Sequence, residues 1–408
     1  MIAEAFDQRN ATDPSHSAWV SANAGSGKTH VLVERIARLL LSGSAPDRLM
    51  CLTFTRAAAA EMSTRLFKRL GEWTLLPDDA LAAQLREVTA EEPTPEMLER
   101  ARRLFAEALE SPGGLRIQTI HAFCERLLKR FPLEAKVVPE FEVLDERATE
   151  QLIDEAKDVV LTRAASDDTA LAQSIAALTG YAGEERFDVL MRGIVGDRGW
   201  IEPFLRSKPF AQLKDDLWRK VGLDPSTDEA AILDGAIAAL GPDKLKRAAD
   251  ALVRGSGKGD PPRGRAIAAF LRRPDRETFD ELYDEFTTDK GERKKLLATK
   301  DVLKGDASLK DILDAIGDGV IALKQRLNAL FIAEQSSYLL HVAGAVLEAC
   351  RTIKDQRAML DYDDLIGHAV RLFETPGAAW ILYKLDGGID HILVDEAQDT
   401  SPLQWRVI

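Results

Sequence analysis

Short apolar runs followed by helix-forming segments recur along the chain. The runs at residues 49–54 and 115–120 have the composition of β-strands, and each leads into a segment of helical character, at residues 57–62 and 121–130. A third apolar run, residues 392–394, is typical of a strand that is buried on both faces. Strands that alternate with helices predict a parallel, doubly wound sheet, so the expected fold class is α/β.

A glycine-rich segment lies between another strand-like run, residues 18–20, and a helix-like stretch at residues 31–40. Its glycines let the backbone curl so that successive N–H groups, together with the N-terminus of the following helix, face phosphate oxygens. A nucleoside triphosphate is therefore the first ligand to consider. The predicted ATP-binding residues are Ala22, Asn23, Ala24, Gly25, Ser26, Gly27, Lys28 and Thr29.

Two side chains of this segment have separate expected roles. Lys28 supplies a cation for the β and γ phosphates, and the Thr29 hydroxyl can coordinate Mg²⁺. Ala22 stands where the pattern G-x-x-x-x-G-K-[ST] has its first glycine, so the tight curl depends on the remaining glycines. The alternative interpretation is a glycine turn that carries a surface lysine.

A second glycine-rich segment, residues 255–260, resembles the first but differs after its lysine, where a phosphate-binding loop needs Ser or Thr and then a helix. A glycine follows Lys258 where Ser or Thr is needed. Pro261 and Pro262 are expected to prevent a helix from following. We therefore interpret this segment as a surface loop.

An acidic pair, Asp395 and Glu396, directly follows the apolar run at residues 392–394. Ligands of open α/β sheets bind at the carboxyl ends of the strands, so these carboxylates are expected to face the phosphate-binding loop. Asp395 suits coordination of Mg²⁺, directly or through water, and Glu396 suits polarising the water that attacks the γ phosphate. The alternative is an exposed acidic turn.

The character of the chain changes between residues 141 and 351, where helical patterns dominate, as at residues 230–240 and 321–349. Two far-separated nucleotide motifs with a long helical stretch between them predict a discontinuous domain. Its expected parts are residues 1–140 and 352–408, with a mostly helical insertion at residues 141–351.

Composition narrows the class of protein. With 408 residues, 45% of them hydrophobic and 30% charged, the chain is typical of a soluble protein of two or three domains. No apolar run looks long enough to span a bilayer and no export signal is evident, so we expect a cytoplasmic protein without membrane contact. The net charge of −13 disfavours a generally basic surface but allows a local basic groove. Cys51, Cys124 and Cys350 form no CxxC motif and are expected to be free, buried thiols.

Four motifs in order resemble those of UvrD/Rep-type superfamily 1 DNA helicases. They are residues 25–29 (Gly-Ser-Gly-Lys-Thr), 52–58, 119–123 and 394–400, and residues 361–365 (Asp-Tyr-Asp-Asp-Leu) resemble a further signature of that family. The resemblance covers the two ends of the chain. It implies a RecA-like P-loop NTPase sheet with a large, mostly helical inserted domain, ATP and Mg²⁺ as cofactors, and ATP-dependent DNA helicase activity with Lys28, Asp395 and Glu396 as catalytic residues.

The same resemblance implies contacts with single-stranded DNA. In the family's second motif they come from positions that match Phe54, Thr55 and Arg56, an aromatic ring for base stacking and polar groups for phosphate. In the threonine-histidine motif they match Thr119 and His121. The alternatives are that Phe54 belongs to the core and that the threonine-histidine pair only caps the helix that it opens.

Two glutamines complete the implied site. Gln8 matches the family's adenine-reading glutamine, because an amide can donate and accept at once, although an ordinary surface role is the alternative. Gln398 resembles the glutamine that couples the hydrolytic site to DNA or to neighbouring motifs.

Within the family, residues 19–24, 56–62 and 399–405 look most like the AddA type of helicase-nuclease. Proteins of that type act on single-stranded and double-stranded DNA ends in double-strand break repair, paired with an AddB-like second subunit. A RecB-type protein and a stand-alone UvrD-like helicase are alternatives. A catalytically weak scaffold protein is another, but the intact Lys28 and Glu396 favour a motor.

The chain stops at Ile408, soon after the acidic pair, and residues 405–408 look like the start of a helix that is cut short. We expect an N-terminal fragment, with a second RecA-like half and an exonuclease domain downstream. Because an arginine finger from the other half contributes on the order of a thousand-fold or more to phosphoryl transfer, the fragment is expected to bind Mg-ATP and single-stranded DNA without unwinding it.

Overall fold

The computed structural model describes residues 10–21, 27–89, 91–111, 114–166, 168–304, 306, 308–375, 377–386 and 388–408. Contacts divide the chain into two compact units. Unit 1 consists of Met1–Thr149 and Lys354–Ile408, and unit 2 of Glu150–Ile353. The first unit is therefore built from both ends of the chain, and the second is one continuous segment between them.

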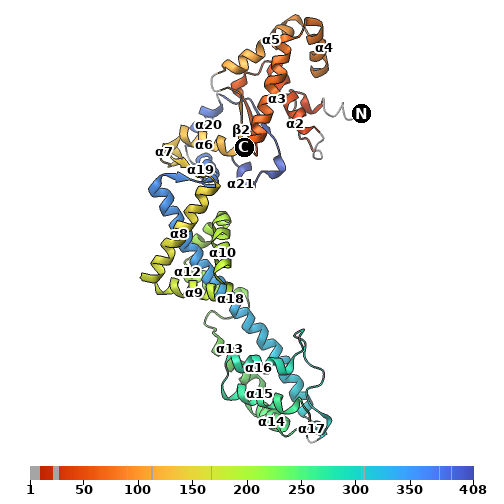
Figure 1. Cartoon of the computed structure of the whole chain (residues 1–408), viewed down its shortest axis with the longest axis vertical. Coiled ribbons are helices and arrows are strands. Elements are labelled where there is room, and N and C mark those ends of the chain that lie inside the picture. Colours follow the sequence, from red (N-terminus) through yellow and green to blue (C-terminus); the bar gives the residue numbers. More distant parts are fainter. Residues whose placement is uncertain are drawn as a thin grey trace. The chain divides into compact units, whose positions relative to one another are not determined.

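Three parallel strands form a sheet in the described part of unit 1, in the order β2-β1-β5 (Figure 1). They are β1 (Leu49–Thr53), β2 (Arg116–Thr119) and β5 (His391–Val394). The strands predicted at residues 49–54, 115–120 and 392–394 are confirmed, as is the α/β class at this coarse level. In the register, Thr53 is opposite Thr119 and Leu52 is opposite Val394, so the carboxyl ends of all three strands are level.

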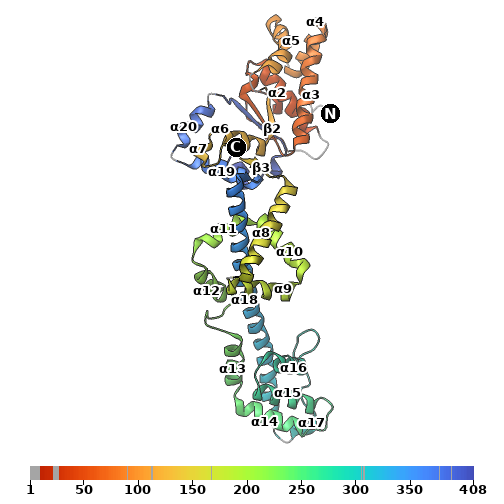
Figure 2. The same ribbon diagram turned by 60° about the vertical axis from the view of Figure 1, so that its left-hand side comes forward.

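Strand β1 is buried along its whole length because helices cover both faces of the sheet. Leu49 and Cys51 pack into one hydrophobic core, and Met50 and Leu52 into the other. Figures 1 and 2 show the two groups of helices on either side of the sheet. The first core includes α2 (Lys28–Leu41), α3 (Arg56–Leu75), α4 (Asp78–Thr89) and α5 (Pro95–Glu110); the second includes α6 (Ile120–Arg130), α7 (Pro132–Ala135), α19 (Tyr362–Glu374) and α20 (Ala378–Asp386).

A two-stranded parallel sheet lies elsewhere in unit 1, where β3 (Glu142–Val143) pairs with β4 (Met359–Leu360). Three other short elements of the described part of unit 1 are the 3₁₀ helices η1 (Pro46–Arg48) and η2 (Ala397–Asp399), and α21 (Pro402–Trp405). The expectation that a helix begins at residue 405 is wrong. The helix begins earlier, because the Ser401 side chain accepts the Gln404 N–H and Pro402 has the fixed φ that suits a first turn.

The strand expected at residues 18–20 is not observed: these residues have no regular secondary structure. The Trp19 side chain is 78% exposed and Val20 is 44% exposed, so neither residue contributes to a core. An apolar composition favours a strand only where a neighbouring strand satisfies its backbone groups, and no described strand pairs with this run.

Unit 2 is built from helices, and a large hydrophobic core forms among its residues 218–333. Two helices, α8 (Glu146–Ser166) and α18 (Leu309–Arg357), cross the boundary between the units. The other helices are α9 (Thr169–Ala182), α10 (Glu184–Gly196), α11 (Arg198–Ser207), α12 (Phe210–Lys220), α13 (Glu229–Leu240), α14 (Pro242–Val253), α15 (Asp260–Arg272), α16 (Arg276–Phe286) and α17 (Lys300–Lys304).

The second glycine-rich segment does lead into a helix, contrary to expectation. Helix α15 begins at Asp260, and its prolines occupy first-turn positions, where a backbone N–H has no helical partner to lose. A Cβ atom on Gly255 would lie 2.7 Å from both Asp260 Cβ and Val302 Cγ2. The glycine therefore permits a close approach of the chain to these side chains.

Helix α18 corrects the expectation that no stretch is apolar enough to span a bilayer. By length and composition it contains such a stretch, of which 44% is buried inside the protein. Leu313, Val320 and Leu327 of this helix belong to the large core among residues 218–333. Burial of this kind is what a core helix needs, so the helix is not evidence for a membrane protein.

None of the three cysteines forms a disulfide and all three are buried, as predicted. Burial raises the pKa of the Cys51 thiol to about 12, and that of Cys124 also to about 12. Both therefore stay protonated at neutral pH, which makes them poor nucleophiles and poor metal ligands.

Candidate nucleotide and nucleic-acid site

Three of the predicted motifs follow one edge of the unit 1 sheet. Residues 54–56 continue from β1, residues 119–121 end β2 and begin α6, and residues 395–396 continue from β5. The Asp395 N–H donates to the Leu52 carbonyl at 2.8 Å, so the ladder between β1 and β5 extends one residue beyond the strand. The register thus gathers motifs that are far apart in the sequence along the carboxyl edge, where ligands of parallel sheets bind.

The phosphate-binding segment is only partly described. Gln8 and residues 22–26 lie outside the described residues, whereas Gly27, Lys28 and Thr29 lie inside them. Gly27 takes a left-handed conformation with φ 88°, which favours glycine, and directly precedes α2. Lys28 and Thr29 are therefore the first two residues of a helix whose N-terminus carries unpaired N–H groups and a partial positive charge.

Lys28 and Glu396 meet at this edge. The Lys28 Nζ lies 3.6 Å from Glu396 Oε2, and both side chains are partly exposed. Because a partly exposed ion pair contributes about 1 kcal/mol at most to stability, its value is in placing the two groups for chemistry. The structure therefore brings together the predicted phosphate-binding cation and the predicted water-polarising carboxylate.

Asp395 is half-buried, and its pKa is raised above the ordinary aspartate value. Burial is the main cause, and the neighbouring Glu396 carboxylate adds to it, while the Glu396 N–H, which donates to Asp395 Oδ1 at 3.1 Å, and Lys28 act in the opposite direction. A poorly solvated carboxylate of this kind gains from a nearby cation. Asp395 and the half-buried Thr29 thus have the oxygen donors that fit Mg²⁺.

No group of three or more His, Cys, Asp or Glu side chains that could hold a metal exists among the described residues. A cation at this site would therefore take few of its ligands from the described protein side chains. This is the usual arrangement for Mg²⁺ bound with a nucleotide, since it keeps several waters and takes further oxygens from the phosphates.

Glu396 has a left-handed backbone with φ 51° and ψ 47°. For a residue with a Cβ this conformation costs roughly 1–2 kcal/mol, and strained residues of this kind concentrate at functional sites. The turn at Glu396 leads directly into η2, where the exposed Gln398 donates its side-chain N–H to Glu396 Oε2. Gln398 is therefore in contact with the carboxylate that sequence analysis linked to water activation.

The residues that follow β1 are exposed. Phe54 is 47% exposed, so it is not a core residue, and Arg56 is exposed as well. Thr55 is exposed, but its hydroxyl accepts the Ala58 N–H at 3.1 Å and so caps α3. An aromatic ring and a guanidinium group, two residues apart at the start of a helix, are thus available to a ligand.

The residues that follow β2 are more buried. Thr119 is 7% exposed, and its hydroxyl accepts the Ala122 N–H at 3.2 Å, which makes it the N-cap of α6. The His121 ring is partly buried and lies 4.8 Å from the Tyr362 ring, centroid to centroid. Burial lowers the pKa of His121, with a smaller opposing effect of Asp363, so the imidazole is neutral near pH 7.

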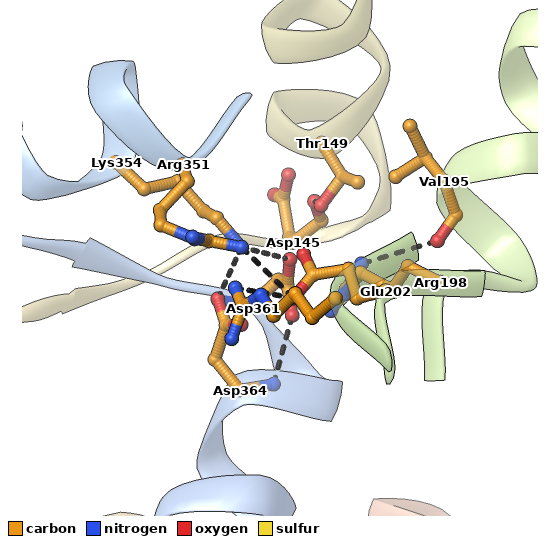
Figure 3. Close-up of polar contacts among 10 residues, drawn as sticks. Asp145, Thr149, Val195, Arg198, Glu202, Arg351, Lys354, Asp361 and Asp364 are labelled. Carbon is orange, nitrogen blue, oxygen red and sulfur yellow. Dashed lines mark hydrogen bonds and ion pairs between the residues drawn. The ribbon is translucent and has the colours of Figure 1, made fainter. Parts of the chain in front are cut away.

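Lys354, a lysine in the last turn of α18, has no local sequence signal that predicts its role. Its Nζ lies 3.0 Å from Asp361 Oδ2 and 2.5 Å from Asp364 Oδ2 (Figure 3). Residues 361–365 resemble a family signature, but nothing in that pattern points to a lysine seven residues before Asp361. Only the fold reveals the partnership.

Comparisons with known proteins identify the family of the chain. The family model described as the UvrD/REP helicase N-terminal domain matches residues 5–408. The chain is similar to curated proteins whose name is that of the A subunit of an ATP-dependent helicase/nuclease. The one from Desulforudis audaxviator is 28% identical over 99% of this chain and 34% of its own length, and the one from Lysinibacillus sphaericus is 25% identical over 95% and 32%. The one from Lactobacillus acidophilus is 34% identical over 36% of this chain and 10% of its own length.

The chain spans about a third of the length of the relatives that it matches from end to end. These relatives are much longer than the 408 residues of this sequence.

Proposed function

We propose a function from one premise: the chain belongs to the UvrD/REP helicase family, whose N-terminal domain it matches over residues 5–408. The proposal is that it forms the ATP-dependent motor half of a DNA helicase-nuclease of the AddA type, which acts in double-strand break repair by homologous recombination. The observation that carries it is the contact of Lys28 with Glu396 beside Asp395, at the carboxyl edge of the sheet.

In this proposal each residue of the ATP site has one task. Lys28 and the N-terminus of α2 bind the β and γ phosphates, and Gln8 reads the adenine. Thr29 and Asp395 hold Mg²⁺, which neutralises charge on the phosphates when it is bound. Glu396 orients the attacking water and accepts its proton, and Gln398 holds the Glu396 carboxylate in place.

The DNA contacts that we propose follow the same sheet edge. The exposed Phe54 ring can stack on a base, and the exposed Arg56 can contact phosphate. His121 is neutral near pH 7 and can donate one hydrogen bond to the DNA backbone. Thr55 and Thr119 act indirectly: their hydroxyls cap α3 and α6 and so fix the helices that carry Arg56 and His121.

At the level of domains, we propose that residues 1–140 and 352–408 form a RecA-like ATP-binding domain and that residues 141–351 form a helical insertion within it. The relatives' name, which is that of the A subunit of a helicase/nuclease, supports a second subunit and a nuclease in a longer protein. We further propose that this subunit is of the AddB kind, that the nuclease is an exonuclease domain, that DNA ends are the substrate and that the protein is cytoplasmic.

We further propose that these 408 residues alone bind Mg-ATP and single-stranded DNA without unwinding a duplex. Motors of this class hydrolyse ATP between two RecA-like halves, and an arginine finger contributes about 10³ to 10⁵ in rate. Brisk DNA-stimulated ATP hydrolysis by the isolated chain would contradict this part.

The deciding experiment separates binding from turnover. We expect Lys28→Ala to weaken Mg-ATP binding, measured by calorimetry, because the cation on the phosphates is lost. Glu396→Gln in the natural full-length protein should keep ATP and DNA binding but lower the turnover number at least about a hundredfold, the usual worth of a general base.

Two control variants sit at exposed positions of the same unit, Lys68→Ala in α3 and Asp399→Asn in η2, and should change neither quantity. An unchanged turnover number in Glu396→Gln would remove Glu396 from water activation. Failure of the unsubstituted protein to bind Mg-ATP would favour the scaffold alternative.

A further inference from the structure

A buried lysine lies at the C-terminal end of α18, within unit 1. Lys354 is 8% exposed, and its Nζ contacts the buried Asp361 at 3.0 Å and the partly buried Asp364 at 2.5 Å. Transferring an ammonium group out of water costs several kcal/mol unless carboxylates and hydrogen bonds compensate. The position of Lys354 is therefore tied closely to those of the two aspartates.

The same two aspartates begin helix α19. The Asp361 side chain accepts the Asp364 N–H at 3.0 Å, and the Asp364 side chain accepts the Asp361 N–H at 3.1 Å, which is a reciprocal capping box. Asp364 Oδ2 serves both the Asp361 N–H and Lys354. Lys354 thus acts on the carboxylates that set where α19 begins and in which direction it starts.

The chain before Asp361 is fixed as well. Leu360 belongs to β4, where its carbonyl accepts the Leu144 N–H at 2.9 Å, and it is opposite Val143 in the register. With β4 on one side and the capping box on the other, the backbone around Asp361 has little freedom.

Tyr362, the first residue of α19, contacts His121. The two ring centroids are 4.8 Å apart and the ring planes are inclined at 46°, within the range of a favourable aromatic contact. His121 in turn lies in the first turn of α6, directly after β2. A continuous series of contacts therefore runs from Lys354 through Asp361 and Asp364 to Tyr362 and His121.

We propose that Lys354 is a positioning residue for His121: by holding the capping box of α19, it fixes the Tyr362 ring, and this ring fixes the orientation of the imidazole. The functional value of the arrangement rests on the proposed role of His121 as a DNA contact. The positioning itself rests only on the contacts among these residues.

Stability alone does not account for this cluster. Replacing a buried ion cluster by apolar residues of similar volume is often neutral or stabilising, so burying charge is a weak way to stabilise a fold. A buried ion pair does restrict geometry, because the hydrogen bonds that the ammonium donates allow only certain positions of the carboxylates. A role in orienting the start of α19 uses that property.

The test compares Lys354→Met, Tyr362→Leu and the double variant in the whole chain. The readout is the NMR signal of the His121 ring, assigned by its loss in His121→Gln. We expect Lys354→Met to move this signal in the same direction as Tyr362→Leu, and the double variant to add little to Tyr362→Leu alone. Lys354→Arg keeps the charge and should retain most of the original position.

The matched control is Lys157→Met in unit 2. Lys157 Nζ also pairs with a carboxylate at 3.0 Å, that of Asp188, but the pair is more exposed and belongs to unit 2, whereas His121 belongs to unit 1. This variant should leave the His121 signal unmoved. A folded Lys354→Met protein with an unmoved His121 signal, or shifts in the two single variants that simply add, would overturn the proposal.

Asp364→Asn covers the case in which Lys354→Met does not fold. It preserves size and one acceptor oxygen, leaves Asp361 to pair with Lys354, and removes one charge from the capping box. We expect it to move the His121 signal in the same direction as Lys354→Met would. A folded Asp364→Asn protein with an unmoved signal would also overturn the proposal.

A second readout separates this inference from the proposed function. If His121 contacts DNA, Lys354→Met and Tyr362→Leu should each raise the Kd for an oligothymidine by about three- to tenfold, without changing the Kd for Mg-ATP. If the His121 signal moves and neither Kd changes, the positioning by Lys354 stands and the DNA role of His121 falls.

Discussion

Asp395 combines a predicted catalytic role with an unfavourable position for a charged group. Its carboxylate is half-buried and next to Glu396, and both conditions raise its pKa. The folded protein therefore holds the Asp395 proton more tightly than the unfolded chain does. Removing that proton at neutral pH costs stability in the folded state, a cost that binding sites often carry.

The pH dependence follows from this shift. Between the ordinary aspartate pKa of 3.8 and the raised value, the folded protein binds more protons than the unfolded chain, so the contribution of Asp395 to stability is present below pH 3.8 and is lost as pH rises through the raised pKa. We predict that Asp395→Asn increases the free energy of unfolding at pH 7 relative to the original protein, and that the difference shrinks towards acid pH. Urea denaturation at several pH values measures it.

The exposed Asp399, four residues further on, provides the control for this prediction. Asp399→Asn should leave the pH profile of stability nearly unchanged. A loss of stability in Asp395→Asn at pH 7 would mean that hydrogen bonding to the ionised carboxylate outweighs its burial.

At the scale of elements, the crossing of α14 and α15 in unit 2 depends on one glycine. A Cβ atom on Gly264 would lie 2.8 Å from the Ala249 carbonyl oxygen and 2.8 Å from the Val253 nitrogen, both of them backbone atoms of α14. Backbone atoms cannot move aside as a flexible side chain can. Gly264 therefore sets how closely the two helices approach.

We predict that Gly264→Ala lowers the free energy of unfolding by about 1–3 kcal/mol, the usual cost of overpacking. Gly193, in α10, is the matched control, because a Cβ atom there would meet nothing within 4 Å. Gly193→Ala should raise the free energy of unfolding by roughly 0.5–1 kcal/mol, since alanine favours a helix more than glycine does. Equal effects of the two substitutions in denaturant titrations would contradict the helix-crossing argument.

Elements whose signal is local were predictable from the sequence. β1 is buried on both faces, so its composition alone marks it as a strand. Residues 18–20 show the limit, because three apolar residues form a strand only if another strand accepts their backbone hydrogen bonds. Pro261 and Pro262 gave a wrong expectation because proline acts differently in the first turn of a helix than inside it.

In the candidate site, too, only the features with a local sequence signal were predictable. The spacing of Gly27, Lys28 and Thr29 is a local pattern, and so is a pair of carboxylates after an apolar run. That Glu396 takes a left-handed conformation, or that Lys354 holds Asp361 and Asp364, depends on contacts that form only when the chain folds. No local composition encodes them.

At the scale of the whole molecule, the chain contains two compact units with separate cores. All the residues that we propose to bind the nucleotide belong to unit 1. A ligand stabilises the state to which it binds by about 2.7 kcal/mol when its concentration is a hundred times Kd. Nucleotide should therefore affect the two units differently.

We predict two thermal transitions in differential scanning calorimetry, of which only one moves to higher temperature when a non-hydrolysable Mg-ATP analogue is added. Lys28→Ala should remove that shift while leaving both transitions in place without nucleotide. A single transition, or an equal shift of both, would show that the units unfold as one cooperative body.

The level ends of β1, β2 and β5 have a consequence for how function can be lost. Deleting Met50 from β1 would move Cys51 to the opposite face of the sheet and displace the residues that follow by one position relative to Asp395 and Glu396. Each motif would remain intact as a string of letters, and a search for those strings would still find all of them. In such a variant the motifs would no longer be aligned at the edge of the sheet, because the strand register determines this alignment and no single motif does.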